Sequence, residues 1–233
     1  MSDQAKHLLA EAKAQARREN IKNFIAKNAK ELKIAAIVIS VVFIGYIIFS
    51  AFQAAQIAKY SAQLQEAVMQ QEMRNYEKAD VALKNIFESA TAPNQIKSFA
   101  GLRYATSLLD QDKKSEAAAV YEEIAKCFSC DEYLRNLSAL LAAKTWMSDD
   151  AEVNSGKLVE KIRKLENSAT VLRNQIAEQR GILQLQKNNL EEAYKVFELI
   201  VKSQEAAPTV KSRAQDYLNV IVSKGYKNEA KVK

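Results

Sequence analysis

Glycine, proline, histidine and cysteine are all scarce in this chain, whose 233 residues include 5 Gly, 2 Pro, 1 His and 2 Cys. Because tight turns between strands rely on glycine and proline, and no alternating apolar run with a hairpin signal is present, the sequence predicts an all-α protein. The only histidine, His7, stands alone, and the sequence contains no Gly-rich phosphate loop and no cluster of metal ligands. We therefore predict no enzymatic activity, cofactor, metal site or small-molecule substrate.

Positive charge is concentrated at the start of the chain. The formal net charge is +6, and residues 1–33 alone contribute +4, from eight Lys or Arg and four acidic residues. The rest of the chain carries only +2. A protein that tracks nucleic-acid phosphates needs a strongly basic surface, so we do not expect nucleic acid among the partners of this protein.

One long apolar run follows the basic segment. Residues 34–52, IAAIVISVVFIGYIIFSAF, contain no charged residue and no Asn, Gln or His. At 1.5 Å per residue a helix of this length reaches about 28 Å, close to the roughly 30 Å of the hydrocarbon core of a bilayer. A cleavable signal peptide is the alternative, but its apolar part is usually shorter, and no small-residue cleavage pattern follows Ser50. The run is therefore predicted to be an uncleaved transmembrane helix.

The flanking charges predict how this helix is oriented. Eight basic residues precede it, whereas in the 20 residues after it only Lys59 is basic. Because the more basic flank stays in the cytoplasm, we expect residues 1–33 to form a cytoplasmic arm near anionic headgroups and the C-terminal part to lie across the membrane. No Gly or Pro occurs between Gly45 and Pro93, so the helix is predicted to continue through residues 53–73.

The C-terminal part of the chain repeats itself every 38 residues. Three series of matching positions keep this step, and we call them ladders: Ile86, Ile124, Ile162 and Ile200; Ala67, Ala105, Ala143 and Gly181; and Ala79, Ala117, Ser155 and Ala193. Each ladder holds one kind of residue, either β-branched apolar or small. Stacked structural repeats bury equivalent positions in the same way, so such positions must agree in size. The isoleucines are therefore predicted to be core residues of about four stacked units.

Each unit is predicted to consist of two helices joined by a polar turn. In the second unit the first helix is expected over residues 96–109, the turn over residues 110–114, and a second helix with Ser115 as its cap. Ala105 is small, which allows the two helices of the unit to approach closely. The third unit departs most from this pattern, because its turn at residues 148–152 is acidic.

These units resemble the tetratricopeptide repeat family. The resemblance rests on the segments RNYEKADVALKNI, KKSEAAAVYEEIA and NNLEEAYKVFELI, each preceded by a small residue on the first helix. The usual period of the family, about 34 residues, is exceeded here by roughly one helical turn. The resemblance implies an α-solenoid of about four helical hairpins over residues 53–225, with a capping helix over residues 209–223 and a polar tail over residues 226–233.

The two cysteines, Cys127 and Cys130, lie three positions apart. A local disulfide is predicted if this part of the chain lies in an oxidising compartment. Two reduced, apolar cysteines are an alternative, and so is a redox-active pair, although the strand–helix–strand pattern around a thioredoxin-like site is missing. No second cysteine pair is present to complete a zinc site.

The predicted binding site is a groove lined by the first helices of successive units. The residues expected on this inner face are mostly apolar, and we call them the groove set: Leu102, Thr106, Leu109, Leu140, Lys144, Met147, Ile182 and Leu185. An apolar groove suits an extended or helical segment of a protein partner. The alternative is that several of these side chains only pack between neighbouring units. Trp146 is expected in the core.

An anchor with a cytoplasmic N-terminus, followed by four helical repeats, resembles the ancillary SecYEG translocon subunit family over about residues 15–223. Its members are single-pass proteins of the bacterial inner membrane with a periplasmic tetratricopeptide-like domain. The resemblance implies translocon subunits, a membrane-anchored periplasmic chaperone and secreted clients as protein partners, and it implies no catalytic residues. Two other interpretations are an envelope scaffold for cell-wall or outer-membrane assembly complexes and a redox partner that uses the two cysteines.

Overall fold

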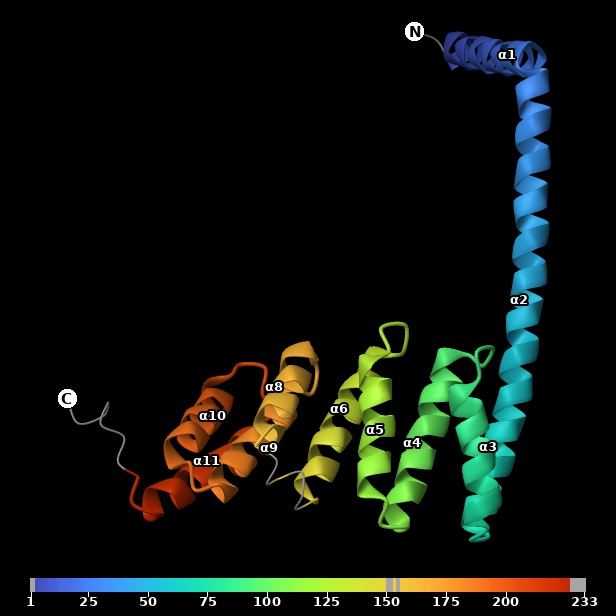
Figure 1. Cartoon of the computed structure of the whole chain (residues 1–233). Helices are drawn as coiled ribbons and strands as arrows, with labels where there is room; N and C mark the ends of the chain where they lie inside the picture. The colour runs from blue at the N-terminus through green and yellow to red at the C-terminus, as the bar shows by residue number, and fades with distance from the viewer. Residues whose placement is uncertain (1–2, 150–152, 154–155, 227–233) are drawn as a thin grey trace. The chain divides into compact units, whose positions relative to one another are not determined.

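The computed structural model describes residues 3–149, 153 and 156–226. Within these ranges the protein is all-helical, as predicted, with ten helices and no strand (Figure 1). The helices are α1 (Asp3–Lys27), α2 (Ala29–Glu72), α3 (Tyr76–Glu88), α4 (Asn94–Asp110), α5 (Lys114–Lys126), α6 (Glu132–Met147), α8 (Leu158–Ser168), α9 (Arg173–Gln186), α10 (Leu190–Lys202) and α11 (Pro208–Ser223).

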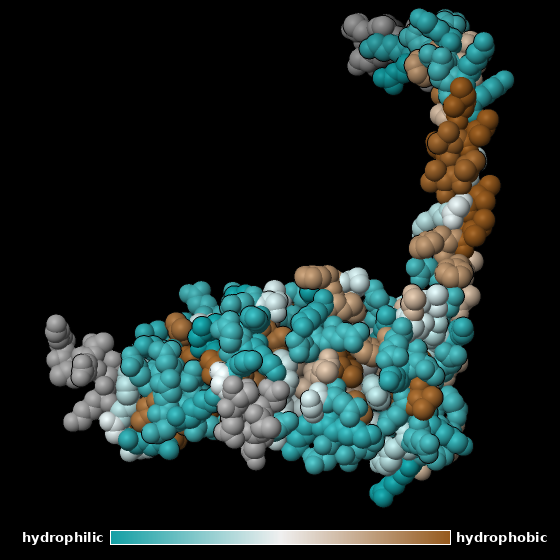
Figure 2. Space-filling view, viewed as in Figure 1, coloured by the Kyte–Doolittle hydropathy of each residue, from teal (hydrophilic) through white to brown (hydrophobic). Residues whose placement is uncertain are grey.

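The chain divides into two compact regions, an N-terminal region of residues 1–55 and a C-terminal region of residues 56–233. The N-terminal region consists of α1 and of α2 as far as Ala55. Helix α2 runs for 44 residues without interruption, so the predicted continuation beyond residue 53 is confirmed as far as Glu72. It is long and apolar enough to cross a membrane. Its side chains in the apolar run are largely exposed, with 68% for Ile39 and 67% for Val42, and Figure 2 shows them as a continuous apolar band.

The ladders lie in the core of the C-terminal region. The four isoleucines are all buried, with at most 2% of their surface exposed. The small-residue ladder from Ala67 to Gly181 is buried as well. In the other small-residue ladder Ala79, Ala117 and Ala193 are completely buried, while Ser155 lies outside the described residues. The 38-residue step in the sequence therefore corresponds to matching buried positions in successive helix pairs.

The backbone repeats the same step at the turn inside each unit. Among the described residues, three other than glycine take left-handed backbone angles, and they are spaced by one or two repeats: Arg74 (φ 60°), Asp112 (φ 59°) and Asn188 (φ 57°). The residue after each of them donates its amide hydrogen to the carbonyl five residues earlier, with N···O distances of 2.8, 2.8 and 2.9 Å. This bond and the left-handed residue together end the first helix and turn the chain into the second.

The turn geometry corrects the predicted cap at Ser115. Helix α5 begins at Lys114, Lys113 occupies the cap position, and no side chain makes a capping hydrogen bond there. The amide of Lys113 is already bonded to the carbonyl of Leu108, 2.8 Å away, and the next residue is helical. Ser115 therefore lies inside the first turn of α5, because the left-handed Asp112 reverses the chain earlier than the sequence pattern indicates.

The third unit departs from the repeat, as the sequence indicates. Helices α3, α5 and α10 end at residues 88, 126 and 202, which are separated by multiples of 38. The same step would end the second helix of the third unit at residue 164, but α8 continues to Ser168. Helix α9 then begins at Arg173, whereas the step from α4 and α6 predicts residue 170.

Helix α11 follows the last helix pair. Its first residue, Pro208, needs no hydrogen-bonded amide at that position. Beyond the end of the helix Gly225 has a φ of 94°, and the amide of Tyr226 bonds to the carbonyl of Ile221. Four side chains of α11 are buried against α9 and α10, so α11 packs against the fourth helix pair: Val210, Ala214, Leu218 and Ile221.

Candidate functional site

The groove set occupies matching positions on three first helices. Leu102 on α4 and Leu140 on α6 are one repeat apart. Two further series keep the same step through α4, α6 and α9: Thr106, Lys144 and Ile182; and Leu109, Met147 and Leu185. The candidate site is therefore a row of equivalent positions that crosses successive units.

The side chains of the groove set differ in how far they reach the surface. Thr106 and Lys144 are exposed. The six apolar members are partly buried and pack against the core clusters of residues 56–233. They therefore contribute both to packing between helices and to the surface. Trp146, in contrast, is buried at 5% exposure, with the Nζ atom of Lys161 5.0 Å from the centre of its ring.

An ion pair occupies the α9 position that corresponds to Leu102 and Leu140. This position holds Glu178, which is 3% exposed. The guanidinium of Arg213 on α11 donates two hydrogen bonds to its carboxylate, both 2.7 Å long, and these bonds raise the pKa of Arg213. Sequence reasoning missed this pair, although a glutamate in a series of leucines was a visible signal.

The hydroxyl groups of Thr106 and Tyr121 lie 3.3 Å apart and join the groove set to the core. Tyr121 is 2% exposed, and its burial raises the pKa of its hydroxyl. The phenol therefore stays neutral near physiological pH. It contributes a hydrogen bond and apolar packing, and it offers no charge for chemistry at this site.

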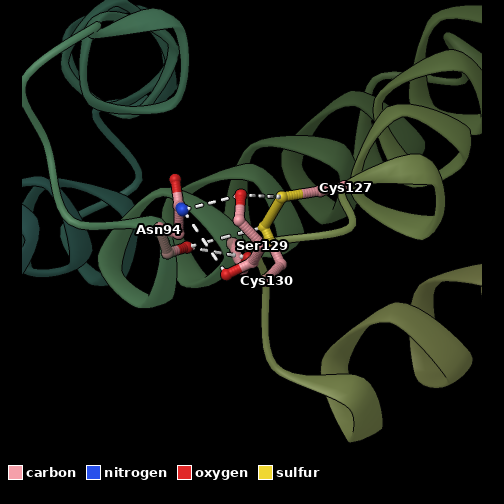
Figure 3. Close-up of a disulfide and its surroundings, with 5 residues drawn as sticks. Asn94, Cys127, Ser129 and Cys130 are labelled. Carbon is pink, nitrogen blue, oxygen red and sulfur yellow. Dashed lines mark hydrogen bonds between the residues drawn. A yellow bond between two sulfur atoms is a disulfide. The ribbon is translucent and has the colours of Figure 1, made fainter.

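The two cysteines form a disulfide that closes the loop between α5 and α6. The amide of Asn94, at the start of α4, donates hydrogen bonds to the hydroxyl and the carbonyl oxygen of Ser129, at 2.9 and 3.4 Å (Figure 3). The loop is thus held against α4, while Phe128 between the cysteines is 93% exposed. Sequence reasoning identified Cys127 and Cys130 but overlooked this phenylalanine.

Several hollows lie outside the groove set, and two of them are lined by a tyrosine or a phenylalanine side chain. The larger, of about 630 Å³, is lined by residues of α2 and α3, among them Lys59, Tyr60 and Asn85. The smaller, of about 280 Å³, lies among the end of α5, the first half of α6 and the end of α8. Neither hollow is lined by a residue of the groove set. In the part of the chain that the structure describes, no group of three His, Cys, Asp or Glu residues is arranged to hold a metal.

Comparison with known proteins identifies no relative. No family model matches the sequence, and neither a curated protein nor a solved structure is significantly similar to it. The functional inference therefore depends on the residues of this chain.

Proposed function

We propose that this protein is a membrane-anchored repeat protein that binds segments of protein partners along its groove set. The observation that carries the proposal is the recurrence of mostly apolar, partly exposed side chains at matching positions of α4, α6 and α9. In an α-solenoid of tetratricopeptide-like hairpins these helices line one continuous surface, which suits an extended or helical segment. The buried ladders and the recurring turn support this architecture.

Helix α2 supplies the anchor in this proposal. Its apolar run is exposed along its length and is preceded by the basic residues of the first 33 positions. This charge distribution favours a cytoplasmic arm and a periplasmic repeat domain at a bacterial inner membrane. The disulfide between Cys127 and Cys130 supports the same assignment, because such bonds persist in oxidising compartments.

The partners in this proposal are the Sec translocon, its associated periplasmic chaperone and secreted clients. Support comes from the resemblance to the ancillary SecYEG translocon subunit family, in which an anchor of the same orientation precedes helical repeats. The groove set would bind exposed apolar segments of clients transiently as they emerge from the translocon.

Substitutions in the groove set test the binding surface. We expect the triple variant Leu102→Asp, Leu109→Asp and Leu140→Asp to lose cross-linked partners, since a charged side chain there is unfavourable against an apolar segment. Arg103→Asp, on the exposed surface of α4, is the control and should retain them. Circular dichroism must show that both variants keep their helices. Undiminished partner recovery by a folded triple variant would refute the role of the groove set.

Cross-linking in intact cells, followed by mass spectrometry of the full-length protein purified in detergent, tests the identity of the partners. Recovery of translocon subunits together with a periplasmic chaperone is the expected result. Recovery restricted to cell-wall or outer-membrane assembly proteins would replace the translocon assignment with that of an envelope scaffold.

A further inference from the structure

A basic residue recurs at one matching position on the first helix of each of the four units and on α11. The five residues are separated by 38 positions each: Lys59, Lys97, Arg135, Arg173 and Lys211. The two arginines differ in how their guanidinium groups are satisfied. The Nε atom of Arg173 donates to the carbonyl of Ala169 at 3.0 Å, whereas the Nε atom of Arg135 is buried and has no hydrogen-bond acceptor. A buried donor without an acceptor is costly, so Arg135 requires an explanation.

Arg135 lines the hollow of about 280 Å³ among α5, α6 and α8. Most of the remaining wall is apolar and consists of Ala125, Ala139, Leu165 and Ala169. The amide of Asn136 is also part of the wall, but it is occupied: it donates to the carbonyl of Glu132 at 2.7 Å and accepts from the backbone amide of Thr170 at 2.8 Å. The hollow therefore combines an apolar interior with one unsatisfied cationic donor.

Phe128 lies beside this hollow and is the most exposed of the large apolar side chains among the described residues. The disulfide and the hydrogen bonds from Asn94 to Ser129 hold its loop in place (Figure 3). At the matching positions in the first and fourth units the chain has Ala90 and Gln204. An exposed phenylalanine is therefore a feature of this loop rather than of the repeat, and it adds apolar surface next to the hollow.

The other charged groups near Arg135 already have partners. Lys126 pairs with Glu122 at 2.6 Å, the carboxylate of Asp131 accepts from the backbone amide of Leu134 at 3.1 Å, and the carboxylate of Glu132 accepts from the hydroxyl of Thr170. The residues that line the hollow include two cations, Lys126 and Arg135, and no acidic residue, so a carboxylate from outside can pair with the guanidinium of Arg135.

The hollow also favours a side-chain carboxylate over the carboxylate of a chain terminus. Chain termini are usually recognised by clusters of backbone amide hydrogens. The backbone at this hollow comes from the C-terminal ends of α5 and α8, which present carbonyl oxygens, and from α6, where the amide of Arg135 is already bonded to the carbonyl of Asp131. Recognition of the anion would therefore depend on the guanidinium of Arg135.

We propose that the Phe128 pocket, defined by Phe128, Arg135, Ala139, Leu165 and Ala169, docks a segment of a partner protein in which a large apolar residue adjoins an Asp or Glu. The carboxylate pairs with the guanidinium of Arg135, and the apolar side chain enters the hollow and packs against Phe128. The volume of the hollow, about 280 Å³, is slightly below the roughly 300–1,000 Å³ of pockets for whole small ligands. A hollow of this size suits a single large side chain. This pocket shares no residue with the groove set and is a second docking surface.

Short peptides with blocked ends test the pocket. Fluorescence anisotropy would measure the binding of labelled Gly/Ser peptides with a central Leu-Glu, Leu-Gln or Ala-Glu pair to the full-length protein in detergent. We expect the Leu-Glu peptide to bind at least about tenfold more tightly than either of the others. Equal binding of the Leu-Glu and Leu-Gln peptides would overturn the proposal. Tighter binding of a peptide that ends in leucine with a free carboxylate would overturn its assignment to an internal segment.

Variants assign the binding to individual residues. Arg135→Gln and Phe128→Ala should each abolish the preference for the Leu-Glu peptide, whereas Arg173→Gln, at the matching position one repeat later, should keep it. Because Phe128 is almost fully exposed, its replacement leaves the fold intact even if the Arg135 variant is unstable. An equal loss in the Arg173 and Arg135 variants would show a nonspecific charge effect. The triple groove variant must also keep the preference, and its loss there would place the peptide in the groove and overturn the proposal.

Discussion

Replacing Gly181 with alanine tests why this position holds glycine where Ala67, Ala105 and Ala143 precede it in the same ladder. A Cβ atom at this position would lie 2.7 Å from Cζ and 2.9 Å from Cε1 of Phe197, well inside the usual contact distance of about 3.5–4.0 Å. The Phe197 ring is completely buried and stacks on Tyr217 with a centroid separation of 4.7 Å, so it has little room to move. Overpacking of this kind costs about 1–3 kcal/mol, and the better helix propensity of alanine offsets up to about 1 kcal/mol. We therefore expect Gly181→Ala to lower the free energy of unfolding by about 1 kcal/mol, and by no more than about 3.

Thermal unfolding of the full-length protein in detergent, followed by circular dichroism, measures this effect. A domain of this size should lose about 2–4 °C in Tm per kcal/mol. Phe197→Leu provides the control background, because it removes the ring atoms that the new Cβ would meet. In that background Gly181→Ala should be neutral or stabilising, which a double-mutant cycle would report as coupling between the two positions. A higher Tm for Gly181→Ala with Phe197 intact would refute the packing argument.

Two further predictions concern bonds between elements. Arg213→Ala should lower Tm more than Glu178→Gln does, because the first variant leaves the carboxylate of Glu178 buried at 3% exposure without a partner. In the second variant the half-exposed arginine can reach water. Thermal unfolding of both variants measures the difference, and a larger loss of Tm in Glu178→Gln would contradict the prediction. Reduction of the Cys127–Cys130 disulfide should destabilise the protein by at most about 2 kcal/mol, because the bond closes a very short loop. A reductant should therefore lower Tm slightly in the wild type and leave the double serine variant unchanged, and an equal shift in both would exclude the disulfide as the cause.

The helical repeat was predictable because it depends on packing between equivalent positions. Residues such as Ile124 and Ala105 must match their counterparts in size, and this requirement is visible as a period in the sequence. The cap at Ser115 was predicted wrongly, because residue preferences alone do not show which residue adopts left-handed backbone angles. In this chain an arginine, an aspartate and an asparagine do so at the same place in three units, and the hydrogen bond of the following amide, more than residue type, defines the turn.

The two candidate sites also differ in whether the sequence alone could predict them. The groove set followed from helical periodicity, and its members do occupy matching positions on α4, α6 and α9. The Phe128 pocket had no such signal. Arg135 is one of five basic residues with the same spacing, and only its atomic surroundings show that its Nε atom lacks the acceptor that Arg173 has.

Composition, charge and periodicity are properties of the chain as written, so the sequence alone was enough to predict an all-helical protein, a long apolar helix near its N-terminus and buried ladders with a 38-residue step. Hydrogen-bond partners and exposure depend on residues that are distant in the sequence. The pairing of Glu178 with Arg213, the hold of Asn94 on the loop of Phe128 and the unsatisfied donor of Arg135 therefore became visible only when folding placed these side chains next to one another.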